Sequence, residues 1–158
     1  MKSRTKARSI ALQVLYEADV VHHPIGEIFE ARINESDLDS SLIDFSQQIV
    51  LGVYPLIHTL DLYIAKHAPE WPLEQVAPVD RNIIRIALWE FTVDNNTPLK
   101  VAINEAVELA KVYGSESTPR FVNGVLGSLA PYQNEIKQAL ENSPPKKTDQ
   151  APLPEKKL

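Results

Sequence analysis

The chain of 158 residues contains no cysteine and only five glycines. Without cysteine it cannot form a disulfide or a cysteine–zinc site. Its few glycines do not build a phosphate loop of the P-loop or dinucleotide-binding type, and no G-x-S-x-G nucleophile elbow is present. The four histidines show no spacing typical of a metal site. We therefore expect neither enzyme activity nor a cofactor or metal site.

Long hydrophobic runs are also missing. No stretch approaches the roughly 18 apolar residues of a membrane-spanning helix. The basic opening residues are not followed by the apolar run and cleavage site of a signal peptide. The hydrophobic content of 44% is nevertheless ample for a packed core. We expect a soluble, cytoplasmic protein without a membrane partner.

Positive charge is scarce in the middle of the chain. The net charge is −5, of which the first 16 residues carry +4 and residues 142–158 carry +2, so residues 17–141 carry −11. The net charge alone argues against a nucleic-acid partner. A localised basic end on an acidic body keeps that partner open.

Apolar residues recur at helical spacing through most of the chain, and no segment alternates as a strand does. We expect a first helix that extends to about residue 18, and a last one that ends near residue 141. Five others are expected between them, over about 25–33, 41–67, 79–91, 98–113 and 119–130. This pattern predicts an all-α fold of about seven helices in two packed, three-helix-bundle-like halves.

Prolines divide this helical pattern. Pro55 is expected to kink or split the helix over 41–67, because proline removes a backbone donor and clashes with the preceding turn. The proline-rich segment 71–78 is predicted to link the two halves. Residues 1–141 are therefore expected to form one helical domain, and 142–158 a disordered tail rich in proline and lysine.

Helix starts are indicated by residues whose side chains accept hydrogen bonds from backbone N–H groups. Ser40 or Ser41 is a candidate cap for the helix over 41–67. Thr97 is the candidate for the helix over 98–113, and Thr118 for the helix over 119–130. Gly114 lies where a helix is expected to stop.

The basic opening residues Lys2, Arg4, Lys6 and Arg8 precede any acid. Cations at a helix amino terminus oppose the helix dipole by about 0.3–1 kcal/mol each. A bound anion reverses that cost, because the first backbone N–H groups also face it. Arg4 and Arg8 are expected along one edge of the apolar face, and the two lysines on the other side. This pattern is typical of a phosphate-binding surface, although a frayed, solvated terminus has the same composition.

Three segments carry a resemblance to a known family. ARSIALQVLYEADV, VDRNIIRIALWEF and PLKVAINEAVELAKVYGSESTPRFVNGVLGSLA resemble the NusB family of bacterial transcription antitermination factors, over about residues 4–131. The resemblance implies a non-catalytic protein that pairs with NusE, a small-subunit ribosomal protein. The pair would bind the boxA element of nascent RNA and promote read-through in ribosomal RNA operons, with other Nus factors and RNA polymerase as indirect partners.

The resemblance also implies which residues act. The candidate RNA-binding residues are Lys2, Arg4, Lys6, Arg8, Ser117, Arg120 and Phe121. Phe121 is expected either to stack on an unpaired base or to be a core residue. Tyr16 and Asp80 match positions that face NusE, and an acidic body suits a basic ribosomal protein. The alternative function is a protein-interaction adaptor, or a self-associating homodimer with little RNA binding.

Overall fold

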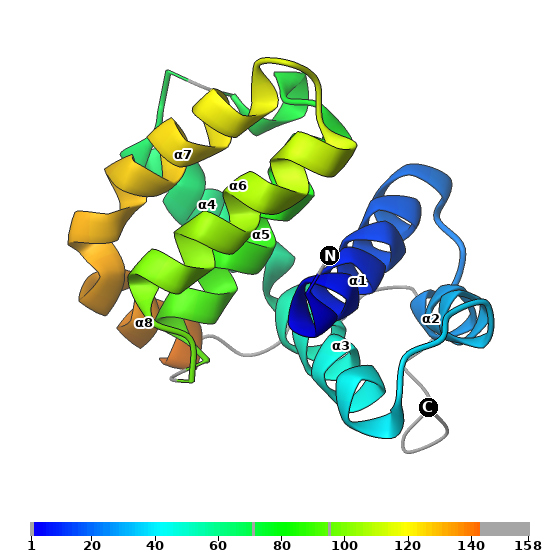
Figure 1. The fold of residues 1–158 in the computed structure, drawn as a ribbon. Coiled ribbons are helices and arrows are strands. Elements are labelled where there is room, and N and C mark those ends of the chain that lie inside the picture. Colours follow the sequence, from blue (N-terminus) through cyan, green and yellow to red (C-terminus); the bar gives the residue numbers. More distant parts are fainter. Residues whose placement is uncertain (1, 71, 95, 143–158) are drawn as a thin grey trace. The chain divides into compact units, whose positions relative to one another are not determined.

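The computed structural model describes residues 2–70, 72–94 and 96–142. These residues form helices and connecting turns without a strand, which confirms the all-α prediction. The helices are α1 (Ser3–Val21), α2 (Ile25–Asn34), α3 (Ser40–Val53), α4 (Ile57–His67), α5 (Pro78–Thr92), α6 (Leu99–Tyr113), α7 (Thr118–Leu129) and α8 (Gln133–Asn142) (Figure 1). The predicted disordered tail, apart from Asn142, lies outside the described residues.

The segment predicted as one helix over 41–67 is divided at Pro55. A 3₁₀ turn over Tyr54–Leu56 separates α3 from α4, because the proline cannot donate the helical hydrogen bond. The helical stretch Ser40–His67 is long and apolar enough to cross a membrane by length and composition. One such stretch is weak evidence for a membrane span, since the core helices of soluble proteins meet the same criterion.

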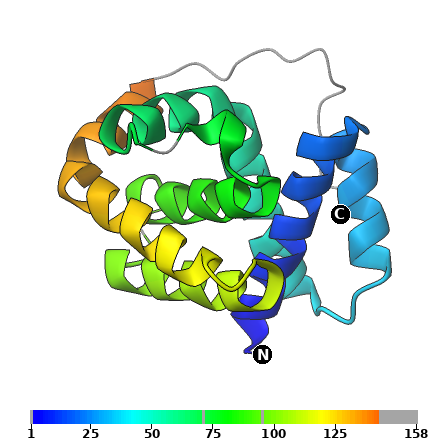
Figure 2. The same ribbon diagram turned by 90° about the horizontal axis from the view of Figure 1, so that it is seen from above.

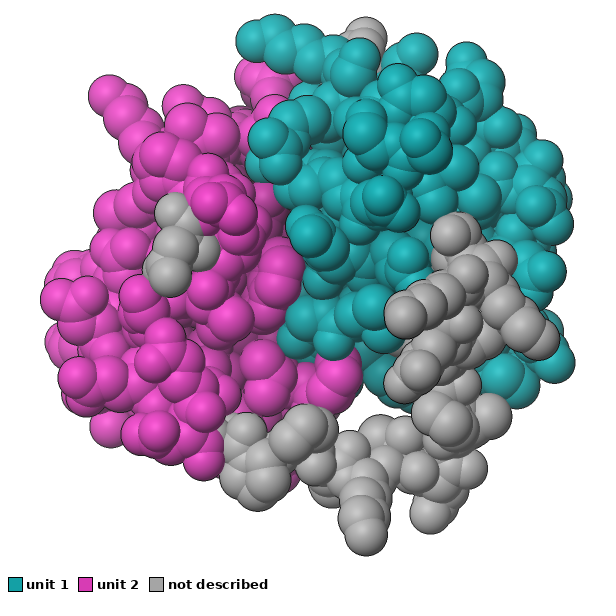
Figure 3. All heavy atoms as spheres, turned by 90° about the horizontal axis from the view of Figure 1, so that it is seen from below, with its two compact units in different colours: residues 1–54, 147–158 teal, residues 55–146 magenta. Residues whose placement is uncertain are grey.

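The chain divides into two compact units. In the described part, residues up to Tyr54 form the first unit, with α1, α2 and α3, and residues from Pro55 onward form the second, with α4 to α8 (Figure 3). The division lies at Pro55 and not at the predicted linker over 71–78. The reason is that α4 contacts α5, α7 and α8 and so belongs to the second unit.

The first unit is organised around α1, which contacts both α2 and α3. Its inner face consists of small and branched apolar residues, such as Ala7, Ala11 and Val14, that are fully buried. Arg32 of α2 donates hydrogen bonds to Gln13 and Glu17 of α1, each at 3.0 Å. The small residues on the inner face permit close helix contact. The Arg32 hydrogen bonds link α2 to α1 beside this face.

The second unit is organised around α5, which contacts α4, α6, α7 and α8 (Figure 2). Residues 82–92 of this helix are all buried. A helix that is apolar on most of its circumference is usually buried centrally, and α5 follows this rule.

A polar network holds α5 against α4. The Arg85 guanidinium donates to both carboxylate oxygens of Asp61, from Nε to Oδ1 at 2.8 Å and from Nη2 to Oδ2 at 2.7 Å. Its Nη1 donates to the Asn82 side chain at 3.0 Å, and Asn82 in turn donates to the Pro78 carbonyl at 2.8 Å. The network therefore reaches the first turn of α5.

Three predicted helix starts differ from the structure. Asp39, and not Ser40 or Ser41, caps α3, because its carboxylate accepts from the Leu42 N–H at 3.0 Å. Pro98 precedes α6, whereas the Thr97 hydroxyl contacts acidic side chains. Thr118 is already inside α7, and Ser117 occupies the cap position without a capping hydrogen bond.

Candidate functional site

The basic end of α1 presents three exposed cations. Lys2, Arg4 and Lys6 are exposed, whereas Arg8 is only 4% exposed. The first turn contains no acid, and Lys2 at the cap position makes no side-chain capping hydrogen bond. The first backbone N–H groups of α1 and three exposed cations therefore lie at the same helix end, where no capping side chain accepts a hydrogen bond. Such an arrangement favours a bound anion such as a phosphate.

Two arginines of α1 lie over one aromatic ring of α3. The Cζ atom of Arg4 is 4.0 Å from the centroid of the Phe45 ring, and that of Arg8 is 5.1 Å from it. The predicted placement of these two arginines along one edge of the helix is confirmed. Phe45 is only 7% exposed, and the apolar pattern of the segment 41–67 carried no signal of its contact with the arginines.

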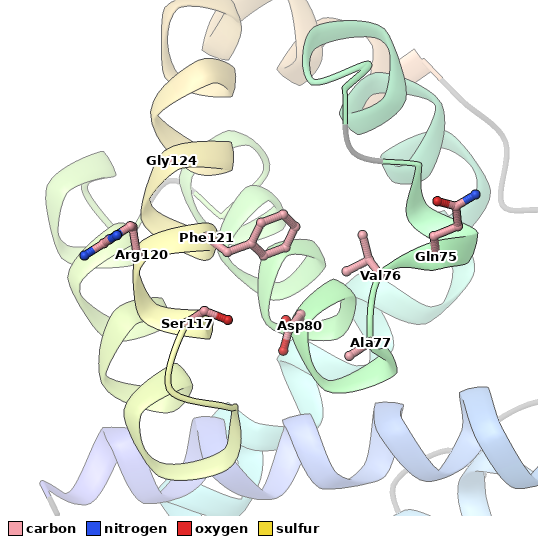
Figure 4. A pocket seen from close by; sticks show the side chains of 8 residues that line it. All are labelled: Gln75, Val76, Ala77, Asp80, Ser117, Arg120, Phe121 and Gly124. Carbon is pink, nitrogen blue, oxygen red and sulfur yellow. The ribbon is translucent and has the colours of Figure 1, made fainter.

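A cavity of about 600 Å³ lies where α5 and α7 begin. Its lining includes Val76, Ala77, Asp80, Ser117, Arg120 and Phe121. The Phe121 ring points from α7 into the cavity toward Val76, whereas the Arg120 guanidinium points away from it (Figure 4). Phe121 is half-buried, so the structure agrees with neither a fully buried core residue nor a fully exposed ring. The structure thus brings together four of the predicted site residues.

The Thr118 hydroxyl ties the loop before α7 to α5. It donates to the Asp80 carboxylate, at 3.1 Å to Oδ1 and 3.3 Å to Oδ2, and accepts from the Ser115 N–H at 2.9 Å. A Cβ atom added at Gly114 would overlap the Thr118 side chain. Asp80, the predicted partner-binding residue, therefore also positions the loop that carries Ser117.

Burial raises the pKa of the Asp80 carboxyl above its ordinary value of 3.8, although the Thr118 hydrogen bond opposes the shift. A raised pKa in the folded state means that the folded chain binds this proton more tightly than the unfolded chain. The contribution of Asp80 to stability is then fully present below its ordinary pKa. It is lost as the pH rises through the raised value.

The Asp80→Asn variant should therefore gain stability relative to wild type as the pH rises from about 3 to about 6. The physical reason is that asparagine cannot ionise in this partly desolvated position. Urea unfolding of both proteins across that range measures the difference in free energy of unfolding. A difference that stays flat with pH would show that the carboxyl titrates alike in the folded and unfolded chains.

The second predicted partner-binding residue, Tyr16, lies on the exposed side of α1. Its side chain is 37% exposed, and Val20 and Val21 at the end of the same helix are 44% and 46% exposed. Val20 lies one turn after Tyr16, so these two exposed apolar side chains share one face of α1. Large exposed apolar side chains that lie together are typical of a protein-binding surface.

The predicted residues form two groups in different units. Lys2, Arg4, Lys6, Arg8 and Tyr16 lie in the first unit, and Asp80, Ser117, Arg120 and Phe121 in the second. Sequence patterns missed Phe45 and the contact between Thr118 and Asp80. Within the described ranges, no group of three or more His, Cys, Asp or Glu side chains is arranged to hold a metal ion.

An all-helical chain with cations at one helix start, and an aromatic residue beside an arginine at another, is typical of helical proteins that bind nucleic acid. The chain belongs to the NusB family, whose sequence model matches residues 5–131. It is 45% identical over 128 residues to the transcription antitermination protein NusB of Roseiflexus castenholzii. This match covers 80% of the present chain and 90% of that protein. It is 38% identical over 138 residues to NusB of Bacillus pumilus, covering 87% and 99%.

Solved structures agree with this assignment. NusB of T. maritima superimposes with a TM-score of 0.77 at 27% identity, over 86% of this chain and 96% of that one. A crystal structure of antitermination factors NusB and NusE in complex with double-stranded RNA contains a chain with a TM-score of 0.73 at 26% identity. This match covers 88% of the present chain and 98% of the other.

Proposed function

We propose that this chain is a transcription antitermination factor that binds boxA-type RNA together with NusE, without catalysis. In this role it would act in the cytoplasm on nascent ribosomal RNA, with other Nus factors and RNA polymerase as indirect partners. The observation that carries the proposal is the basic start of α1. Its three exposed cations have no acid in the first turn to neutralise them.

Each unit contributes one RNA-contacting surface in this proposal. Lys2, Arg4 and Lys6 neutralise phosphates, whereas Arg8 is mostly covered and contributes less open surface. Phe121 offers its ring to an unpaired base, with Arg120 and Ser117 beside it. The relative in complex with NusE holds double-stranded RNA. The phosphates of double-stranded RNA carry the same charge as those of single-stranded RNA. The basic surface at the start of α1 can therefore contact the phosphates of either kind of RNA.

NusE is proposed to contact Asp80 and the apolar surface around Tyr16. A cation of a basic ribosomal protein would stabilise the partly desolvated Asp80 carboxylate. The reason is that the positive charge replaces part of the hydration that the carboxylate has lost. The exposed Tyr16, Val20 and Val21 side chains would supply the apolar area of that contact.

Binding of a fluorescein-labelled, single-stranded boxA-type RNA, followed by anisotropy with and without NusE, tests the proposal. We expect NusE to strengthen binding, and we expect salt to weaken it. The Lys2→Gln/Lys6→Gln variant should lower the slope of log affinity against log salt by about 1.4, since each lost phosphate contact removes about 0.7.

The matched control is Lys66→Gln/Lys111→Gln. These two lysines are also exposed, at 59% and 57%, but each pairs with a glutamate outside the proposed surfaces. The control should leave the salt slope unchanged. A salt-insensitive dimer that excludes RNA would contradict the proposal and favour a homodimeric adaptor.

A further inference from the structure

The contact between Arg4 and Phe45 leaves one side of an arginine open. The Arg4 Cζ lies 4.0 Å from the centroid of the Phe45 ring and over its face. Arg4 is nevertheless an exposed residue, whereas Phe45 is only 7% exposed. The Phe45 ring therefore lies under the guanidinium of a residue that is itself open to solvent.

Arg8 completes the support from the same helix. It lies one turn after Arg4 on α1, its Cζ is 5.1 Å from the Phe45 centroid, and its side chain is 4% exposed. The ring is thus covered by two cations from α1, of which only Arg4 remains open to solvent. Phe45 is held in turn by the contact between α1 and α3. The position of the Arg4 guanidinium is consequently set by the fold.

The planar guanidinium group can stack on a nucleobase, which an ammonium group cannot do. An arginine already held on an aromatic ring loses less side-chain freedom when a base arrives. A cation that only neutralises phosphate needs neither the plane nor the ring. The aromatic support under an exposed arginine therefore indicates a use beyond charge.

We propose that Arg4, supported by Phe45, is a stacking platform for one unpaired base of single-stranded RNA. This inference rests on the proposed RNA binding and adds a specific contact to it. The platform contacts the face of the base and not its edge. It therefore accepts any base, with preference for the larger face of a purine, and requires that the base be unpaired.

The test is a scan of the single-stranded boxA-type RNA in which each nucleotide is made abasic in turn. An abasic nucleotide keeps the phosphate and removes the stacking face. For the wild-type chain, we expect one position at which loss of the base weakens binding about tenfold, whereas exchange of that base for another has little effect.

The decisive variant is Arg4→Lys, which keeps the charge and removes the plane. Because Arg4 is exposed, the substitution leaves the core intact. The abasic penalty at that position should fall below about twofold, while the salt slope stays as in wild type. In Phe45→Leu, which keeps Arg4 but removes its support, the penalty should fall to a few-fold, with folding checked by circular dichroism.

The matched control is Lys6→Gln, a neighbouring exposed cation without an aromatic support. It should lower the salt slope by about 0.7 and keep the full abasic penalty. If Arg4→Lys keeps the wild-type penalty at every position, the platform is wrong, while the salt slope still reports RNA binding by the basic helix start. If wild type binds none of these RNAs, the proposed function fails together with the platform.

Discussion

Replacement of Asp61 by alanine is expected to lower the free energy of unfolding by about 3 kcal/mol. The Asp61 carboxylate accepts two hydrogen bonds from Arg85, whose side chain is only 6% exposed. Without the carboxylate, a buried guanidinium loses two hydrogen bonds and the negative charge that Asp61 supplies. Because the Asp61 side chain is itself 28% exposed, the loss should lie at the lower end of the range for buried pairs.

Urea unfolding with an unchanged m-value measures this loss. The matched control is Glu108→Ala, which removes the exposed partner of Lys111 and should change stability by less than about 0.5 kcal/mol. The Asp61→Leu/Arg85→Met double variant should recover most of the stability, since an apolar pair needs no charge compensation. A loss below about 1 kcal/mol in Asp61→Ala would show that Arg85 finds another partner or water.

Replacement of Gly114 by alanine is expected to destabilise the chain by about 2–3 kcal/mol. The backbone of Gly114 is extended, with φ at −91°, so alanine can adopt its conformation. The obstacle is packing, because the new methyl group would overlap the Thr118 side chain. Thr118 cannot easily move aside, since it is 1% exposed and bonded to Asp80 and to the Ser115 N–H.

The matched control is Gly127→Ala, in the interior of α7. A Cβ atom at Gly127 meets nothing within 4 Å, so the substitution should stabilise the helix by about 0.5–1 kcal/mol. Thermal and urea unfolding of both variants measure whether each alanine lowers or raises the free energy of unfolding. Equal effects from the two alanines would show that the loop before α7 relaxes without cost.

Both predictions concern the same part of the second unit. The Arg85 network reaches Pro78 in the first turn of α5, and the Thr118 hydroxyl joins the start of α7 to Asp80. These contacts position the cavity in which Phe121 lies. The variants should therefore weaken contacts to bases, whereas the salt slope set by α1 in the first unit should change little.

Much of the fold could be predicted from local patterns. The apolar spacing along α1, the nearly continuous apolar run of α5 and the prolines at the starts of α6 and α7 each identify a helix by its own sequence. The division at Pro55 was expected as a kink or a split. The assignment of α4 to the second unit was not expected, because it depends on contacts with α5, α7 and α8. Likewise, Asp39 rather than a serine caps α3, since neighbouring acceptors compete for the same N–H group.

The candidate site was predictable only in part. The cations at the start of α1 could be recognised from the sequence alone. The helix dipole acts on residues of the same helix, so no tertiary contact has to be known. The contact of Arg4 with Phe45, by contrast, joins α1 to α3, and the whole of α2 lies between these helices in the sequence. His67, one of the scattered histidines, stacks on Tyr132 with centroids 3.7 Å apart and contacts Glu135 at 3.0 Å. No spacing pattern links residues that lie so far apart in the sequence.

The sequence by itself determined the helical class, the family and the charge that the first helix start presents, because these depend on neighbouring residues and on composition. Tertiary structure alone decided which cations stay exposed, which ring supports Arg4 and which carboxylate loses part of its water. The physical reason is that burial and side-chain contact depend on helix packing. Packing brings together residues that no local interaction relates.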